Sequence, residues 1–161
     1  MIREVIPSTD SKQIAEIYNK YIEKTTISFE TEPLSVVAMQ IRVREISSEY
    51  PYYVYMDDDK IIGYAYAHKW KERAAYSNTL ETSIYVDSSC RNHGVGKKLM
   101  SHLIGECRKR NVHVLIACIT ANNVESINFH KSLGFAEVSH FHNVGEKFGG
   151  KLDIIDMEMQ L

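Results

Sequence analysis

The chain has few of the residues that mark disordered linkers, disulfide frameworks or membrane spans. Only 8 of its 161 residues are Gly and 3 are Pro, and no Pro/Gly/Ser-rich segment interrupts it. It has no apolar run of the roughly 18 residues that a membrane-spanning helix needs, and residues 1–5 lack the apolar stretch of a signal peptide. We therefore expect one cytoplasmic globular domain over residues 1–161.

The cysteines and the charge balance argue against further classes of protein. Cys90, Cys107 and Cys118 are odd in number and lack the close C-x-x-C pairing of metal and redox sites, which favours free thiols. The formal net charge is -2 and the pI is near 6.4. We therefore expect neither nucleic acid nor a membrane surface as a partner. A local basic cluster could still bind a small anion.

Hydrophobic periodicity divides the chain into alternating helices and strands. It predicts helices after the cap candidates Ser8 and Asp10, over residues 36–48 after Ser35, and over residues 95–107 and 124–133. It predicts strands over residues 53–55, 61–67, 80–86, 112–119, 136–144 and 152–161. The order includes a strand-helix-strand crossover between antiparallel segments, so the fold class is α+β with a mixed sheet.

The segment RNHGVGKK, residues 91–98, lies where a predicted strand ends and an amphipathic helix begins. Its glycines allow a ligand to approach the backbone closely, and the first N–H groups of the helix have no partners within the helix. Together with Arg91, Lys97 and Lys98 they predict an anion site that suits a pyrophosphate. The alternative is a plain turn. A dinucleotide fingerprint is excluded because G-x-G-x-x-G is absent, and a phosphate loop because Lys98 replaces its Ser or Thr.

The pattern R-x-x-G-x-G at residues 91–96 resembles the acetyl-CoA pyrophosphate loop of the GCN5-related N-acetyltransferase (GNAT) superfamily. Residues 123–135, NVESINFHKSLGF, resemble the segment N-x-x-S-x-x-x-H-x-x-L-G-F of its phosphinothricin and methionine sulfoximine acetyltransferase branch. Further stretches resemble the same branch: residues 17–19, 26–30, 71–76, 81–87 and 147–153. Residues 120–121 and 150–151 depart from it, which concerns the acceptor more than the cofactor.

The resemblance implies a mostly antiparallel central sheet flanked by helices, with a splay between strands 80–86 and 112–119. It also implies acetyl-CoA as co-substrate, a small-molecule amine as acceptor and a homodimer. The implied cofactor-binding residues are Ile84, Tyr85, Val86, Arg91, Asn92, His93, Gly94, Val95, Gly96, Lys97, Asn123 and Ser126. The i, i+3, i+4, i+7 spacing independently places four residues on one helix face: Asn123, Ser126, Ile127 and His130.

Acetyl transfer requires a neutral amine, and therefore a general base. The resemblance assigns this role to Glu81, which without it is a solvated strand residue. Backbone N–H groups of residues 84–86 could stabilise the oxyanion. His130 could supply a proton to the leaving thiolate, where many relatives use Tyr; on spacing alone it is a surface histidine.

Residue chemistry and the resemblance together suggest the acceptor site. Arg73 is the candidate partner of a substrate carboxylate, and Phe29, Tyr76 and Phe148 are candidate apolar walls. The implied acceptor is phosphinothricin, methionine sulfoximine or methionine sulfone, with antibiotic or herbicide resistance as the setting. A polyamine, an aminoglycoside, a peptide N-terminus and a non-catalytic acyl-CoA sensor remain alternatives.

His140 and His142 stand at i, i+2 on a predicted strand, so both point to one face and could ligate zinc. The sequence offers no evident third ligand. We therefore predict that the protein holds no metal.

Overall fold

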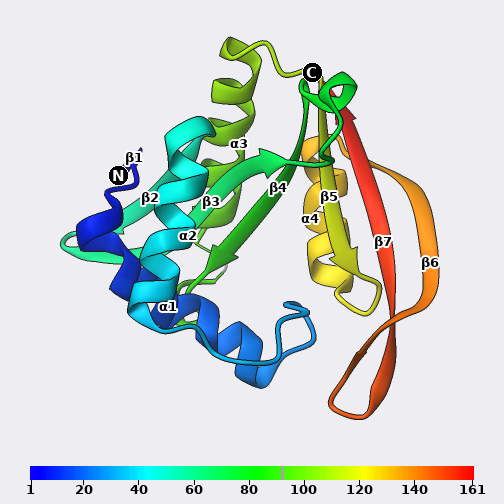
Figure 1. The fold of residues 1–161 in the computed structure, drawn as a ribbon, viewed down its shortest axis with the longest axis horizontal. Helices are drawn as coiled ribbons and strands as arrows, with labels where there is room; N and C mark the ends of the chain where they lie inside the picture. The colour runs from blue at the N-terminus through cyan, green and yellow to red at the C-terminus, as the bar shows by residue number, and fades with distance from the viewer. Residues whose placement is uncertain (92) are drawn as a thin grey trace.

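A computed structural model describes residues 1–91 and 93–161, which form one seven-stranded sheet with helices on both faces (Figure 1). The strand order across the sheet is β1-β2-β3-β4-β5-β7-β6. The strands are Ile2–Glu4 (β1), Tyr52–Asp57 (β2), Lys60–Lys69 (β3), Thr79–Val86 (β4), Val114–Thr120 (β5), Ala136–Lys147 (β6) and Gly150–Gln160 (β7). The helices are Pro7–Lys24 (α1), Val36–Glu49 (α2), Val95–Lys109 (α3) and Val124–Leu133 (α4), and 3-10 turns cover Ala74–Tyr76 and Ser88–Cys90.

Two apolar clusters, one on each face of the sheet, form the core. The predicted stripe of α1 packs with Met39 and Val43 of α2 over β2 and β3. The predicted stripe of α3 packs against the other face with residues of β5, α4 and β7. Burial of these stripes holds the helices against the sheet, since apolar area removed from water contributes about 25 cal/mol per Å².

The helix starts show where local sequence rules held and where they failed. The Ser35 side chain accepts a hydrogen bond from the Ala38 N–H at 3.1 Å, as predicted for the start of α2. The predicted cap Ser8 was wrong, because α1 begins at Pro7 with Ile6 at the N-cap and no capping side chain. Proline suits the first turn, where its missing N–H is not needed. Asp10 instead accepts from the Ile6 N–H at 2.7 Å from inside the helix.

The predicted crossover is present: β4 continues through α3 into β5, which lies parallel to β4. Only three register pairs join these strands in the described chain, and the last is Glu81 with Ile116. On its other side β4 stays paired with β3 as far as Val86. Strands β4 and β5 therefore diverge after Glu81, as Figure 1 shows. The predicted splay and the predicted fold class are confirmed.

The loop between α1 and α2 is fixed beside this gap by contacts with distant segments. The Thr120 hydroxyl at the end of β5 donates to the Thr26 carbonyl at 2.8 Å. The buried ammonium of Lys147 donates to the Ser28 carbonyl at 2.8 Å. These contacts close the open end of the gap with a loop remote in sequence. Of the helices described, none is long and apolar enough to cross a bilayer.

Candidate active site

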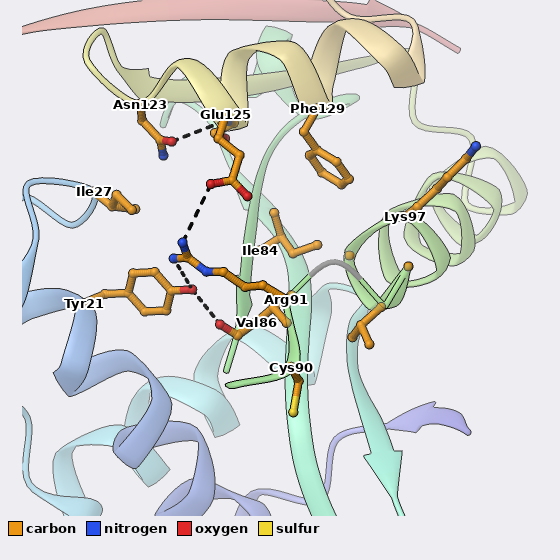
Figure 2. A pocket seen from close by; sticks show the side chains of 14 residues that line it. Tyr21, Ile27, Ile84, Val86, Cys90, Arg91, Lys97, Asn123, Glu125 and Phe129 are labelled. Carbon is orange, nitrogen blue, oxygen red and sulfur yellow. Dashed lines mark hydrogen bonds and ion pairs between the residues drawn. The ribbon is translucent and has the colours of Figure 1, made fainter. Parts of the chain in front are cut away.

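A cavity of about 280 Å³ lies between the end of β4 and the N-terminal ends of α3 and α4 (Figure 2). Most of the predicted cofactor residues line it: Ile84, Val86, Arg91, Gly94, Val95, Gly96, Lys97, Asn123 and Ser126. Five further lining residues were not predicted from the sequence: Tyr21, Ile27, Cys90, Glu125 and Phe129. Three segments that are far apart in the chain thus form one cavity.

The start of α3 is built for close approach of a ligand. Gly94, its N-cap, has φ +73°, a left-handed conformation that side chains other than glycine rarely adopt. Apart from its two neighbours in the chain, none of the described residues has an atom within 4 Å of the position a Cβ would take there, so this side of the backbone is open. The first N–H groups of the helix and the positive end of its dipole favour an anion at this position.

Arg91 supplies a positive charge to this cavity and is held by two side chains (Figure 2). Its guanidinium donates to the Tyr21 hydroxyl at 3.3 Å and lies 3.7 Å from a carboxylate oxygen of Glu125. Tyr21 in turn donates to the Val86 carbonyl, which fixes its ring. The hydrogen bond to Tyr21 raises the pKa of Arg91, which therefore remains a full positive charge. Glu125 is largely exposed and can release Arg91 to a bound anion.

A second cavity of about 120 Å³ adjoins the first at the gap between β4 and β5. The two share Ile27, Ile84, Asn123 and Ser126. The second also contains both predicted catalytic residues and the predicted Tyr85, and its further lining residues are Thr82, Ser83, Ala117, Cys118, Ile119 and Thr120. The predicted cofactor and catalytic groups are therefore neighbours in space.

Glu81 stands in the second cavity at the point where the β4–β5 pairing ends. Burial raises the pKa of its carboxyl above the usual value, although His68 across the strand pair and the Cys118 thiol partly oppose the rise. A carboxylate with a raised pKa is a stronger proton acceptor than a solvated one. This environment suits a general base.

His130 is buried on α4 between the rings of Phe129 and Phe135. Burial lowers its pKa, so the imidazole is mainly neutral at neutral pH. Its Nδ1 lies 2.8 Å from the Ser126 carbonyl oxygen, which can only accept, so Nδ1 carries the proton and Nε2 the lone pair. This tautomer accepts a proton more readily than it gives one, and the predicted donor role gains no support from it.

The four predicted acceptor-site residues line neither cavity. The segment with Arg73 and Tyr76 precedes β4 and lies beside the C-terminus at the top of Figure 1. The β6–β7 turn with Phe148 lies at the opposite end of the sheet. Phe29 lies close to Gly145 near that turn, because a Cβ on Gly145 would fall 2.3 Å from its ring. One chain therefore does not bring these four residues together.

Two predicted cofactor-binding residues, Asn92 and His93, are not among the described residues that line the cavities. His93 is exposed and lines neither cavity. Asn92 lies outside the described residues. Of the helix face predicted on α4, Asn123 both caps the helix, by accepting from the Ser126 N–H at 3.2 Å, and lines the cavities. Ile127 points into the core instead.

The residues present fit acetyl-CoA. Arg91, Lys97 and the start of α3 offer charge and N–H donors to phosphates, and the edge of β4 after Glu81 has no β5 partner in the described chain. An extended amide-bearing arm could pair with that edge. When bound, acetyl-CoA would supply an activated acetyl thioester.

Comparison with known proteins identifies the class. Residues 4–157 match the family described as the acetyltransferase (GNAT) domain. The chain therefore belongs to the GNAT acetyltransferase family, and it is an acetyl-CoA-dependent N-acetyltransferase.

Relatives refine this assignment. The phosphinothricin N-acetyltransferase of Alcaligenes faecalis is 33% identical over 98% of this chain and 81% of its own length. The structure of a phosphinothricin acetyltransferase from Sinorhizobium meliloti in complex with acetyl-CoA is 34% identical, with a TM-score of 0.95 over 100% of this chain and 88% of that one. A ribosomal-protein-alanine N-acetyltransferase from Brucella melitensis is 32% identical, with a TM-score of 0.96 over 100% and 99%.

Proposed function

We propose that this enzyme acetylates the primary amine of a small amino-acid-like substrate of the phosphinothricin, methionine sulfoximine or methionine sulfone type. The observation that carries the proposal is Glu81, a partly buried carboxylate with a raised pKa in a small cavity that adjoins the anion-binding one. The name of the relative from Alcaligenes faecalis supports the choice of acceptor. The second cavity, at about 120 Å³, favours a compact substrate.

In the proposed mechanism each side chain has a separate task. Arg91, Lys97 and the N-terminal turn of α3 bind the phosphates. Glu81 accepts the proton of the substrate ammonium, directly or through a water molecule, and so produces the neutral amine that can attack. Backbone N–H groups of residues 84–86 stabilise negative charge on the carbonyl oxygen. The second cavity holds His130 in its neutral form, which can receive a hydrogen bond at Nε2.

The test measures acetyl-CoA-dependent thiol release with phosphinothricin, methionine sulfoximine and methionine sulfone, each against a reaction without acceptor. We expect acceptor-dependent release with at least one of them. Release with none, although acetyl-CoA raises Tm, would contradict the acceptor class and leave the cofactor assignment standing.

A second acceptor class has specific support. The Brucella melitensis relative is named for acetylating a ribosomal protein at alanine. A peptide with an N-terminal alanine therefore joins the panel, together with a polyamine and an aminoglycoside. If the peptide has the highest kcat/KM, the acceptor is a protein N-terminus.

We further propose that the enzyme is a cytoplasmic homodimer. The outer strand β6 and the turn after it expose large apolar side chains, which are Val138, Phe141, Val144 and Phe148. Exposed apolar groups on an edge strand favour association with another chain. Light scattering gives the mass in solution, and a monomer at micromolar concentration would contradict the proposal.

A further inference from the structure

The β6–β7 hairpin gathers three potential metal ligands outside both cavities. His140 and His142 on β6 and Asp153 on β7 place their donor atoms within 4.8 Å of one another. Asp153 lies on the partner strand, eleven residues beyond His142, so spacing in the sequence does not reveal it as a third ligand. We propose that these three residues form a binding site for a divalent transition-metal ion, with zinc as the reference ion.

The distances suit a shared ion. Asp153 Oδ2 lies 2.9 Å from His140 Nε2 and 3.2 Å from His142 Nδ1. Bonds of about 2.0–2.1 Å at tetrahedral angles would separate two donors by roughly 3.3 Å. The imidazole rings are stacked with centroids 4.3 Å apart. Each presents a ring nitrogen to the same carboxylate oxygen. His142 is well exposed and its ring can turn to close the set.

The carboxylate is already oriented for this role. The other oxygen of Asp153, Oδ1, accepts the Asn143 N–H at 2.8 Å, an outer contact of the kind that fixes metal ligands. Asp153 therefore presents Oδ2 to the two imidazoles in a fixed orientation.

Two imidazoles and one carboxylate suit borderline ions such as Zn²⁺, Ni²⁺ and Cu²⁺ better than Mg²⁺ or Ca²⁺, which prefer sets made only of oxygen. Three protein ligands leave positions for water. None of the three lines either cavity, so the ion would not take part in acetyl transfer.

The site would act on the shape of the hairpin. The β6–β7 register shifts between Phe141 and Gly145, and Asn143 within this bulge has φ 54°. An ion held by both strands would fix the bulge, which lies on the edge strand between the exposed apolar residues Phe141 and Val144. The ion would therefore stabilise this edge of the sheet, whichever acceptor the enzyme uses.

Calorimetric titration of the metal-free full chain with Zn²⁺ alone tests the site, and Co²⁺ absorption reports the coordination geometry. We expect one ion per chain and a rise in Tm with Zn²⁺. His142→Ala should weaken Zn²⁺ binding at least roughly tenfold, since loss of even an outer-sphere partner commonly costs that much. His142 is exposed, so this variant should fold, and His140→Ala should agree with it.

Two controls keep the result specific. His113→Ala removes an exposed histidine elsewhere and should leave Zn²⁺ affinity unchanged. Cys118→Ser removes the exposed thiol and should also leave it unchanged. No binding to the wild-type chain, equal affinity in His142→Ala, or loss of binding in either control would overturn the proposal.

Discussion

Two partly buried glutamates in this molecule have opposite environments. Glu30, in the loop after α1, accepts two hydrogen bonds from the Arg42 guanidinium at 2.7 and 2.8 Å and one from the Tyr18 hydroxyl. The bonds from Arg42 are the main cause that lowers its pKa. Glu81 has no ion pair among the described residues, and burial raises its pKa.

The difference separates a structural carboxylate from a reactive one. A carboxylate bound by a bidentate guanidinium is fixed in position and hard to protonate, so it contributes to stability. A carboxylate removed from water without a cation attracts protons, and the ammonium form of a substrate amine can supply one. Each of the following experiments changes one side of this contrast.

The largest effect is expected from Glu81→Gln, which keeps the shape but removes the proton acceptor. We expect kcat to fall about 10²- to 10⁴-fold with the acetyl-CoA Kd nearly unchanged. Steady-state kinetics and calorimetry give the two values. The matched change Glu30→Gln should lower Tm and reduce kcat far less. Equal losses of kcat and acetyl-CoA affinity in Glu81→Gln would contradict the assigned role.

Arg91 is a cation that pairs with the Glu125 carboxylate in the free enzyme and would bind the phosphates of acetyl-CoA in the complex. Arg91→Ala should raise the Kd of acetyl-CoA about 10- to 100-fold, since a hydrogen bond to a charged group contributes about 1.5–3 kcal/mol. Glu125→Gln should have the opposite and smaller effect, because it removes a competing anion 3.7 Å from Arg91. Calorimetric titration with acetyl-CoA measures both effects. Tighter binding in Arg91→Ala would show that the phosphates lie elsewhere.

Arg42→Met removes the guanidinium that binds Glu30, the structural carboxylate. The pair is partly exposed, so we expect a loss of about 1 kcal/mol in the free energy of unfolding at pH 7. The pKa of Glu30 is lowered in the folded chain, so this contribution is present above the unfolded pKa of about 4.3 and disappears as pH falls through the folded value. Urea unfolding at several pH values should show the difference between the proteins shrinking at acidic pH. A difference that grows there would contradict the pairing.

The smallest effect is expected from His68→Gln, across the β3–β4 pair from Glu81. His68 lowers the pKa of Glu81, so its removal should raise that pKa further. The base must be ionised to act, so the acidic limb of the kcat/KM profile should move to higher pH. A shift to lower pH would mean that another group controls this limb.

Much of the fold could be predicted because its signals are local. The apolar stripes of α1 and α3, the cap at Ser35 and the left-handed Gly134 after α4 each follow from a few neighbouring residues. The anion site could be predicted from the sequence for the same reason, since Arg91, Gly94 and the start of α3 lie within one short segment.

The rest of the site depends on contacts that sequence spacing does not encode. Ile27 lines both cavities, and the loop that carries it is held there by hydrogen bonds to distant residues, among them the one from the Thr120 hydroxyl to the Thr26 carbonyl. Tyr21 belongs to the buried stripe of α1, and nothing local indicates that its hydroxyl reaches Val86. The predicted acceptor residues came from separate segments, and the sheet topology places those segments at opposite ends.

The short pairing between β4 and β5 also has a dynamic consequence. Backbone amides of β4 beyond Glu81 that face the gap lack a strand partner in the described chain, so in the free enzyme they should exchange with deuterated solvent faster than those bonded to β3. Bound cofactor would slow this exchange along one edge of one strand. The loop that borders the gap is held in part by the Thr120 hydroxyl, which donates to the Thr26 carbonyl. Removing that hydroxyl should therefore raise the mobility of this loop while leaving the sheet intact.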